Sequence, residues 1–124
     1  AGCGGRDLLD KVRDVNGIKV IGAEVEVGDP ASLREAADVL RRKIGSGVVC
    51  LGGNNGGKAA LVVAVTSDYK GRLNAGDLIR EVAEIVGGRG GGRPDLAQAG
   101  GPEVARLQDA VERIYDAVAR AVRT

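Results

Sequence analysis

The stretch Val48-Val49-Cys50-Leu51-Gly52-Gly53-Asn54-Asn55-Gly56-Gly57-Lys58-Ala59-Ala60-Leu61-Val62-Val63-Ala64-Val65 decides the fold class. Residues 48–51 and 60–65 are apolar at consecutive positions, and the glycines and asparagines between them favour a turn. The pattern predicts a β-hairpin. Because neither run alternates with polar residues, both strands should be covered on both faces, which requires helices on each side of the sheet.

The turn of this hairpin also resembles a phosphate-binding P-loop, in which a glycine, four further residues and a second glycine precede lysine and a hydroxyl residue. Two features oppose that interpretation. Ala59 has no hydroxyl to coordinate magnesium, and residues 60–65 are typical of a strand rather than of a helix whose N-terminus would face a phosphate. We therefore interpret residues 52–57 as a hairpin turn and exclude nucleotide hydrolysis by this motif.

The amino-terminal side of the hairpin predicts a helix and a strand. Residues 6–15 carry apolar side chains at helical spacing, which predicts a short helix that stops at Asn16-Gly17. Residues 18–27 are rich in valine and isoleucine and predict a strand. Within it, Gly22 stands where the alternation changes phase, as a β-bulge would produce.

Three further helices are expected. The first follows Asp29-Pro30, begins with a capping box of Ser32 and Glu35, and ends at Gly45. The second is capped by Asn74, and the third begins at Pro102 and carries a long apolar stripe. The order of elements predicts an α/β fold: a single domain with a mixed β-sheet and helices on both faces.

Composition narrows the chemistry. The 124 residues can form one domain, and the formal net charge of +1 selects no class of partner. The chain contains no histidine, which removes imidazole bases, Ser-His-Asp systems and the commonest metal ligand. We therefore expect no catalytic residues and no metal site in this chain.

The cysteines and the amino terminus indicate a cellular setting. Cys3 lies in a glycine-rich leader and Cys50 in an apolar run, so a structural disulfide is not expected and a reducing, cytoplasmic compartment fits better. No stretch has the length of a membrane span or the pattern of a signal peptide. Residues 1–5 read as a linker or leader, and residues 6–124 as the single domain.

A glycine-rich segment, residues 87–101, separates the last two predicted helices. It holds two arginines and no acidic residue before Asp95, so it predicts a locally cationic loop whose backbone can lie close to phosphates. A flexible connector is the alternative. The G-x-G-x-x-G pattern of dinucleotide sites fails because Arg93 takes the place of the last glycine.

Two other groups of basic residues are better explained as solvated faces. Three arginines recur every seven residues on the last predicted helix: Arg106, Arg113 and Arg120. Asp109 and Asp116 stand four residues before two of them and are expected to neutralise the stripe. Residues 41–43, Arg-Arg-Lys, suit the C-terminal end of a helix dipole without any partner.

Four basic residues flank the loops around the helix capped by Asn74: Lys70, Arg72, Arg89 and Arg93. If the fold brings these loops together, phosphate contact follows. The chain has two tyrosines and no other aromatic residue, so a folded RNA backbone is a better target than unstacked bases.

The run 90–101, Gly-Gly-Gly-Arg-Pro-Asp-Leu-Ala-Gln-Ala-Gly-Gly, resembles the signature of the carboxy-terminal domain of alanyl-tRNA synthetases, the DHHA1 (C-Ala) domain. Similarity to that family extends to residues 15–17, 45–49 and 74–76, and so covers nearly the whole chain. In DHH-family phosphoesterases the same domain type commonly has histidine after the glycines. This chain has Arg93 there, which favours the synthetase branch.

The resemblance implies a non-catalytic module that holds the outer corner of tRNA and helps to link aminoacylation with editing. The glycine-rich segment and the basic residues around it predict these nucleic-acid-binding residues: Lys70, Arg72, Arg89, Gly90, Gly91, Gly92, Arg93 and Gln98. The resemblance also implies partner domains upstream in the same enzyme, which would use ATP, magnesium and zinc. A dimerisation domain of that enzyme and the substrate-binding domain of a DHH-family phosphoesterase are the alternatives.

Overall fold

A computed structural model describes residues 13–15, 18–25, 29–45, 47–66, 73–92 and 95–122. Its strands are β1 (Arg13–Val15), β2 (Ile18–Glu24), β3 (Gly47–Asn55), β4 (Lys58–Val65), β5 (Arg89–Gly92) and β6 (Leu96–Gly101). Its helices are α2 (Pro30–Ile44), α3 (Ala75–Ile85) and α4 (Leu107–Val122), the last preceded by the 3-10 turn η2 (Val104–Arg106).

The strands form one six-stranded sheet in the order β1-β2-β3-β4-β6-β5. β2 and β3 are parallel and are connected through α2, whereas the other neighbours are antiparallel. The predicted hairpin is β3–β4, and it turns at Gly56 and Gly57, whose φ angles of 61° and 92° favour glycine. The expected mixed sheet is therefore confirmed, and so is the hairpin turn in place of a P-loop.

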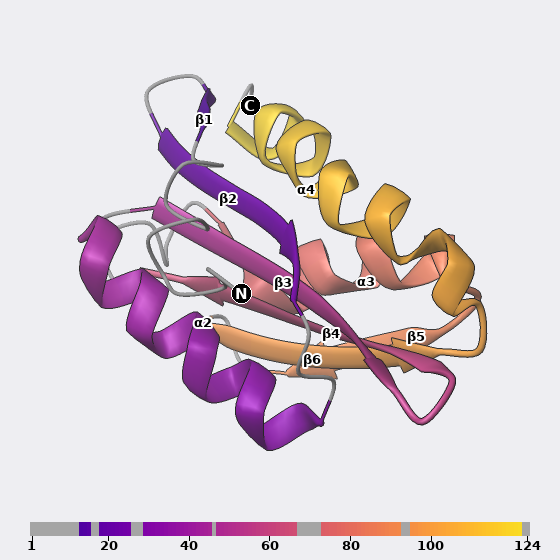
Figure 1. Cartoon of the computed structure of the whole chain (residues 1–124). Helices are drawn as coiled ribbons and strands as arrows, with labels where there is room; N and C mark the ends of the chain where they lie inside the picture. The colour runs from indigo at the N-terminus through magenta and orange to yellow at the C-terminus, as the bar shows by residue number, and fades with distance from the viewer. Residues whose placement is uncertain are drawn as a thin grey trace.

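Helices cover the sheet on two sides, with α2 on one face and α3 and α4 on the other (Figure 1). Successive residues of β3 alternate between the two cores: Val48 and Cys50 belong to the α3–α4 side, and Val49 and Leu51 to the α2 side. All four are fully buried. The consecutive apolar positions arise, as expected, from a strand that is covered on both faces.

The predicted amino-terminal helix is wrong where it can be compared. Residues 6–12 lie outside the described residues, but Arg13–Val15 form strand β1, which pairs with the start of β2. The Arg13 guanidinium also lies over the Tyr115 ring, 4.4 Å from its centroid. Pairing with β2 and this contact with α4 outweigh a weak local preference for helix.

Gly22 lets helix α4 pack close against strand β2, and it does not form the predicted bulge. The pairing of β2 with β3 runs without interruption through this residue. A Cβ atom here would collide with the Val111 carbonyl oxygen of α4. The Tyr115 hydroxyl accepts a hydrogen bond from the Gly22 N–H at 2.9 Å and donates to the Gly22 carbonyl at 3.3 Å. Burial raises the pKa of Tyr115, which favours the protonated hydroxyl that this second bond requires.

The helix ends follow the sequence except at two starts. The helix predicted to begin at Pro102 begins as the 3-10 turn η2 at Val104 and continues as α4 from Leu107. Asp29, and not Ser32, is the N-cap of α2, and its Oδ2 accepts a hydrogen bond of 3.0 Å from the Ser32 N–H. This bond lowers the pKa of Asp29. Pro30 therefore occupies the first turn, where its missing N–H costs nothing. The predicted stop at Gly45 and the predicted cap at Asn74 are confirmed.

Candidate nucleic-acid interface

The glycine-rich segment forms a hairpin at one edge of the sheet. β5 pairs with β6, and β6 pairs with the buried strand β4. The predicted loop between two helices is therefore wrong in this respect. Glycine and alanine have low strand propensity, so the sequence did not indicate strands here, and the strands form because β6 pairs with β4. Figure 1 shows this hairpin at the opposite end of the sheet from β1.

Two glycines permit the close packing of this hairpin. A Cβ atom on Gly90 would overlap the Ala99 side chain of β6, and one on Gly88 would overlap the Gly100 carbonyl oxygen. The segment can therefore lie flat against its neighbours only without side chains at these positions.

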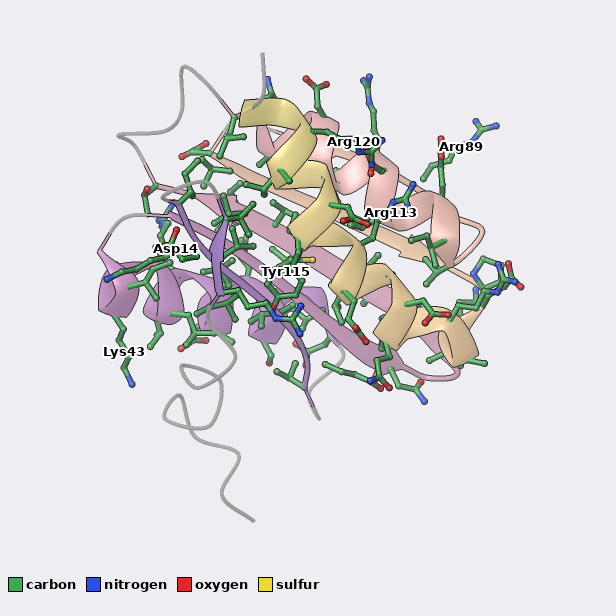
Figure 2. The ribbon with its side chains drawn as sticks, turned by 90° about the horizontal axis from the view of Figure 1, so that it is seen from above. Asp14, Lys43, Arg89, Arg113, Tyr115 and Arg120 are labelled. Carbon is green, nitrogen blue, oxygen red and sulfur yellow. The ribbon has the colours of Figure 1, made fainter. Side chains whose placement is uncertain are left out.

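The opposite face of β5 is open. No atom of a described residue lies within 4 Å of the place where a Cβ atom on Gly91 would stand. Arg89, at the start of β5, is exposed, and Figure 2 shows its side chain extending away from the molecule. In the described part of the chain, β5 has β6 as its one strand partner, so its outer edge offers unpaired backbone groups beside a guanidinium.

Five of the eight predicted site residues come together here. Arg89 and Gly90–Gly92 form β5, and Gln98 of β6 lies directly opposite Gly91 in the pairing register. Lys70, Arg72 and Arg93 lie outside the described residues, so their position relative to the hairpin stays a prediction.

Four of the other basic residues named from the sequence have ion-pair partners in the structure. On α4, Arg113 and Arg120 both form ion pairs with Glu81 of α3, and Arg113 Nε lies 3.0 Å from Glu81 Oε2. The predicted partners, Asp109 and Asp116, are therefore wrong.

On α2, the carboxylate of Asp38 binds both Arg41 and Arg42. The partner was missed because the sequence pattern at the end of this helix suggested only an interaction with the helix dipole. The carboxylates of Asp38 and Glu81 thus partly neutralise both clusters.

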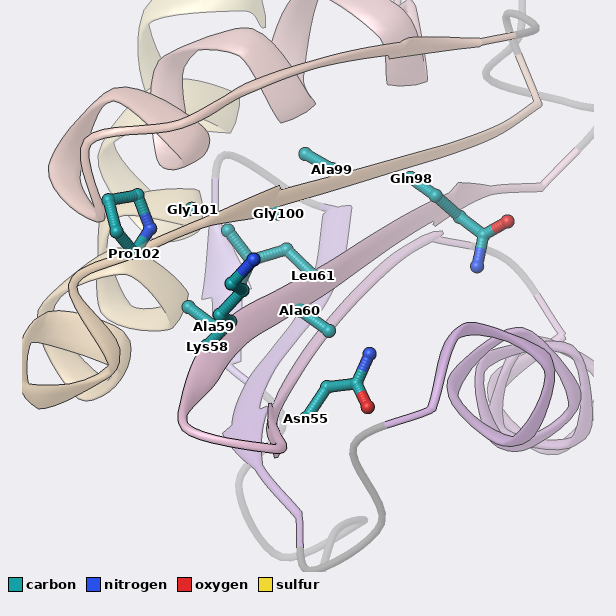
Figure 3. A pocket seen from close by; sticks show the side chains of 10 residues that line it. All are labelled: Asn55, Lys58, Ala59, Ala60, Leu61, Gln98, Ala99, Gly100, Gly101 and Pro102. Atoms are coloured by element: carbon teal, nitrogen blue, oxygen red, sulfur yellow. The ribbon is translucent and has the colours of Figure 1, made fainter.

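Two residues were missed by sequence reasoning. Asn55 and Lys58, at the ends of β3 and β4, line a pocket of about 560 Å³ together with Gln98 of β6 (Figure 3). Lys58 belongs to the P-loop-like motif, and interpreting that motif as a turn removed it from consideration. Nothing in the local sequence indicates that Gln98, forty residues later, lines the same pocket.

The described residues show little potential for chemistry. None of them form a group of three or more His, Cys, Asp or Glu side chains able to hold a metal ion. Burial raises the pKa of the Cys50 thiol to about 12, which makes it a poor nucleophile. Within the described ranges, no helix is both long and apolar enough to cross a membrane.

The architecture and the glycine hairpin define a known class of domain. The DHHA1 domain family matches residues 17–120, and the chain belongs to that family. Within it, the chain corresponds to the carboxy-terminal C-Ala domain of alanyl-tRNA synthetases. The C-Ala domain from Aquifex aeolicus superimposes with a TM-score of 0.79 at 32% identity, covering 88% of this chain and 98% of that one.

Sequence relatives agree with this assignment. An alanine–tRNA ligase of Anaeromyxobacter dehalogenans is 53% identical over 116 residues, which are 94% of this chain and 13% of that protein. An alanine–tRNA ligase of Desulfosudis oleivorans is 50% identical over 111 residues, 90% of this chain and 13% of that protein. The chain thus spans about an eighth of the length of these relatives. A DHH-domain protein at 16% identity, with a TM-score of 0.59, shares the fold alone.

Proposed function

We propose that this domain is the tRNA-binding module of an alanyl-tRNA synthetase and that it presents the β5–β6 hairpin to the RNA backbone. The observation that carries the proposal is the open glycine strand β5 with exposed Arg89 at its start. Arg89 makes no ion pair with any described residue. Its charge is therefore available to a phosphate, and Gly91 allows that phosphate to approach the backbone.

The environment of Tyr115 favours a folded RNA backbone over unstacked bases. Its ring is occupied by Arg13 and its hydroxyl is bonded to Gly22. The other tyrosine, Tyr69, lies outside the described residues. Without a free aromatic surface in the described region, recognition would depend on phosphates, sugars and shape.

In the whole enzyme, this module would hold the outer corner of tRNA and help to link aminoacylation with editing. The ligase reaction, with its ATP and magnesium, and the zinc of the editing site would belong to other domains of that enzyme. The setting would be the cytoplasm. These roles are proposals that extend from the family of the chain.

Binding to a tRNA transcript at several salt concentrations tests the proposal. We expect Arg89→Gln to weaken binding and to reduce the salt dependence by about one phosphate contact. We expect Gly91→Val to weaken binding without any change of charge, because the new side chain would stand in the open space over β5. Lys43→Gln, which removes an exposed charge at the end of α2, is the matched control. Absence of wild-type binding at low salt would contradict the proposal.

Dimerisation is a second candidate function, favoured by the unpaired outer edge of β5. Such an edge can pair with the same strand of a second copy. Sedimentation velocity decides this point, because a monomer at high protein concentration excludes it.

A further inference from the structure

Among the described residues, the α2 face of the sheet is only partly covered. α2 packs against β3 and β4, and Leu96, at the start of β6, borders that core. Toward the other end of β6 the same face opens into the pocket of about 560 Å³. This volume lies in the range of small-ligand sites in proteins.

Register places the polar lining of this pocket on one face. Asn55 lies opposite Lys58 in the β3–β4 pair, and Ala60 lies opposite Gly100 in the β4–β6 pair. Lys58 and Ala60 are two residues apart, as are Gln98 and Gly100, so all of these positions face the α2 side. Ala60 belongs to the core on the α2 side, so the face that these residues share is the one that α2 covers. We call these five residues the Lys58 pocket (Figure 3).

The floor and rim of the Lys58 pocket differ in chemistry. The floor is formed by Ala60 and Gly100, whose small size keeps it flat. The rim carries one ammonium group, on Lys58, and two carboxamides, on Asn55 and Gln98. None of the described lining residues is acidic, and exposed Lys58 makes no ion pair with a described residue.

Such a lining suits an anionic group attached to a flat body with hydrogen-bonding edges. An uncompensated ammonium attracts a phosphate, and carboxamides both donate and accept hydrogen bonds. A flat floor of alanine and glycine can contact a sugar or base without sequence preference. A nucleotide has the anionic group, the flat body and the hydrogen-bonding edges, whereas an acidic peptide lacks the flat body.

The Lys58 pocket is continuous with the β5–β6 hairpin. Gln98, on its rim, lies directly opposite Gly91 of β5. An RNA strand lying over Gly91 therefore reaches the rim of the Lys58 pocket at Gln98 within one strand spacing, about 5 Å. Lys58 lies four residues along β4 from Val62, the partner of Gln98, which is about 13 Å farther.

We propose that the Lys58 pocket holds one nucleotide of the bound RNA, with its phosphate on Lys58 Nζ and its sugar or base over Ala60 and Gly100. This inference rests on the proposed function and adds a second contact point to it. Two contact points on one face would fix the direction in which the RNA crosses the sheet, which a single patch cannot do.

Paired lysine variants of the 124-residue chain test the inference with a tRNA transcript. We expect Lys58→Gln to weaken binding about 3- to 10-fold near 0.1 M salt and to lower the slope of log K against log salt by about one. Lys58→Arg should restore the slope, since it keeps the charge. Asn55→Ala should weaken binding and leave the slope unchanged. Lys43→Gln should change affinity less than 2-fold, because Lys43 and Arg89 lie at opposite ends of the molecule (Figure 2).

The outcomes separate the inference from the proposed function. If the Lys58→Gln variant binds the transcript with the same affinity as the Lys43→Gln variant while Arg89→Gln still weakens binding, the Lys58 pocket is not a contact point and the hairpin remains one. If wild-type protein binds no RNA, both ideas fail. If adenosine monophosphate alone binds in calorimetry as tightly as the transcript and Lys58→Gln abolishes its binding, the occupant is a free nucleotide and the inference is overturned. Circular dichroism melts of every variant identify any loss of fold.

Discussion

The two hairpins of the sheet, β3–β4 and β5–β6, have the same topology and opposite composition. In β3–β4 the central side chains are apolar, mostly valine and leucine, and buried on both faces of the sheet. In β5–β6 one strand is nearly all glycine and faces open space at Gly91. The comparison teaches that one sheet can hold its stability at the centre and leave an edge open for the binding proposed above.

The energetic contrast has a simple physical basis. A fully buried valine or leucine contributes about 1.5 to 3 kcal/mol through removal of apolar surface from water. β4 contains a run of such residues, whereas β5 contributes backbone hydrogen bonds and a single long side chain, Arg89. The edge hairpin thus depends on the centre for its position, and the centre depends little on the edge.

The largest expected effect comes from breaking the centre. Leu61→Ala removes a side chain that is 1% exposed in β4, and we expect a loss of about 2 to 5 kcal/mol in the free energy of unfolding. Urea denaturation followed by circular dichroism measures it. A loss below about 1 kcal/mol would mean that the centre is not the main source of stability.

A smaller effect should separate two adjacent glycines of the edge. Gly90→Ala places a methyl group against Ala99, and we expect a cost of about 1 to 3 kcal/mol in stability. Gly91→Ala meets no atom of a described residue within 4 Å and should change stability by about 0.5 kcal/mol or less. Equal effects in thermal melts would show that packing against β6 does not determine where glycine is needed.

A third change should loosen the edge and spare the centre. The Asn74 side chain accepts hydrogen bonds from the Gly76 N–H at 2.8 Å and the Asp77 N–H at 3.4 Å, at the start of α3. We expect Asn74→Ala to cost about 1 kcal/mol. Because α3 packs beside β5 near Gly76, amide hydrogen exchange should rise in β5 and β6 first. Equal loss of protection in β3 and β4 would contradict the division between the hairpins.

The smallest effect concerns reactivity at the centre. Burial raises the pKa of the Cys50 thiol to about 12, so roughly one thiol in ten thousand is ionised at pH 8. In a Cys3→Ser variant, we expect a thiol-reactive dye to label Cys50 at the rate of global unfolding. Urea-unfolded protein is the control, and fast labelling under native conditions would show that β3 is accessible.

Sequence patterns predicted the elements whose burial repeats along the chain. The helical spacing of apolar residues indicated α2, α3 and α4, and the consecutive apolar runs indicated β3 and β4. Strands β1, β5 and β6 were missed, because a short strand without a repeating apolar face resembles a helix turn or a loop. Of the candidate site, Arg89, the three glycines and Gln98 were named from the sequence, whereas Asn55 and Lys58 were assigned only to a turn.

The amino-acid sequence by itself determined the α/β class, the central hairpin, most helix ends and the absence of histidine chemistry, since each depends on residues close together in the chain or on composition alone. The tertiary structure decided that glycines 90–92 form an edge strand, that Glu81 binds two arginines, and that Gly22 admits Tyr115 from 93 residues away. Such contacts depend on the close approach of distant segments, and a local pattern carries no record of the partner that a residue will meet.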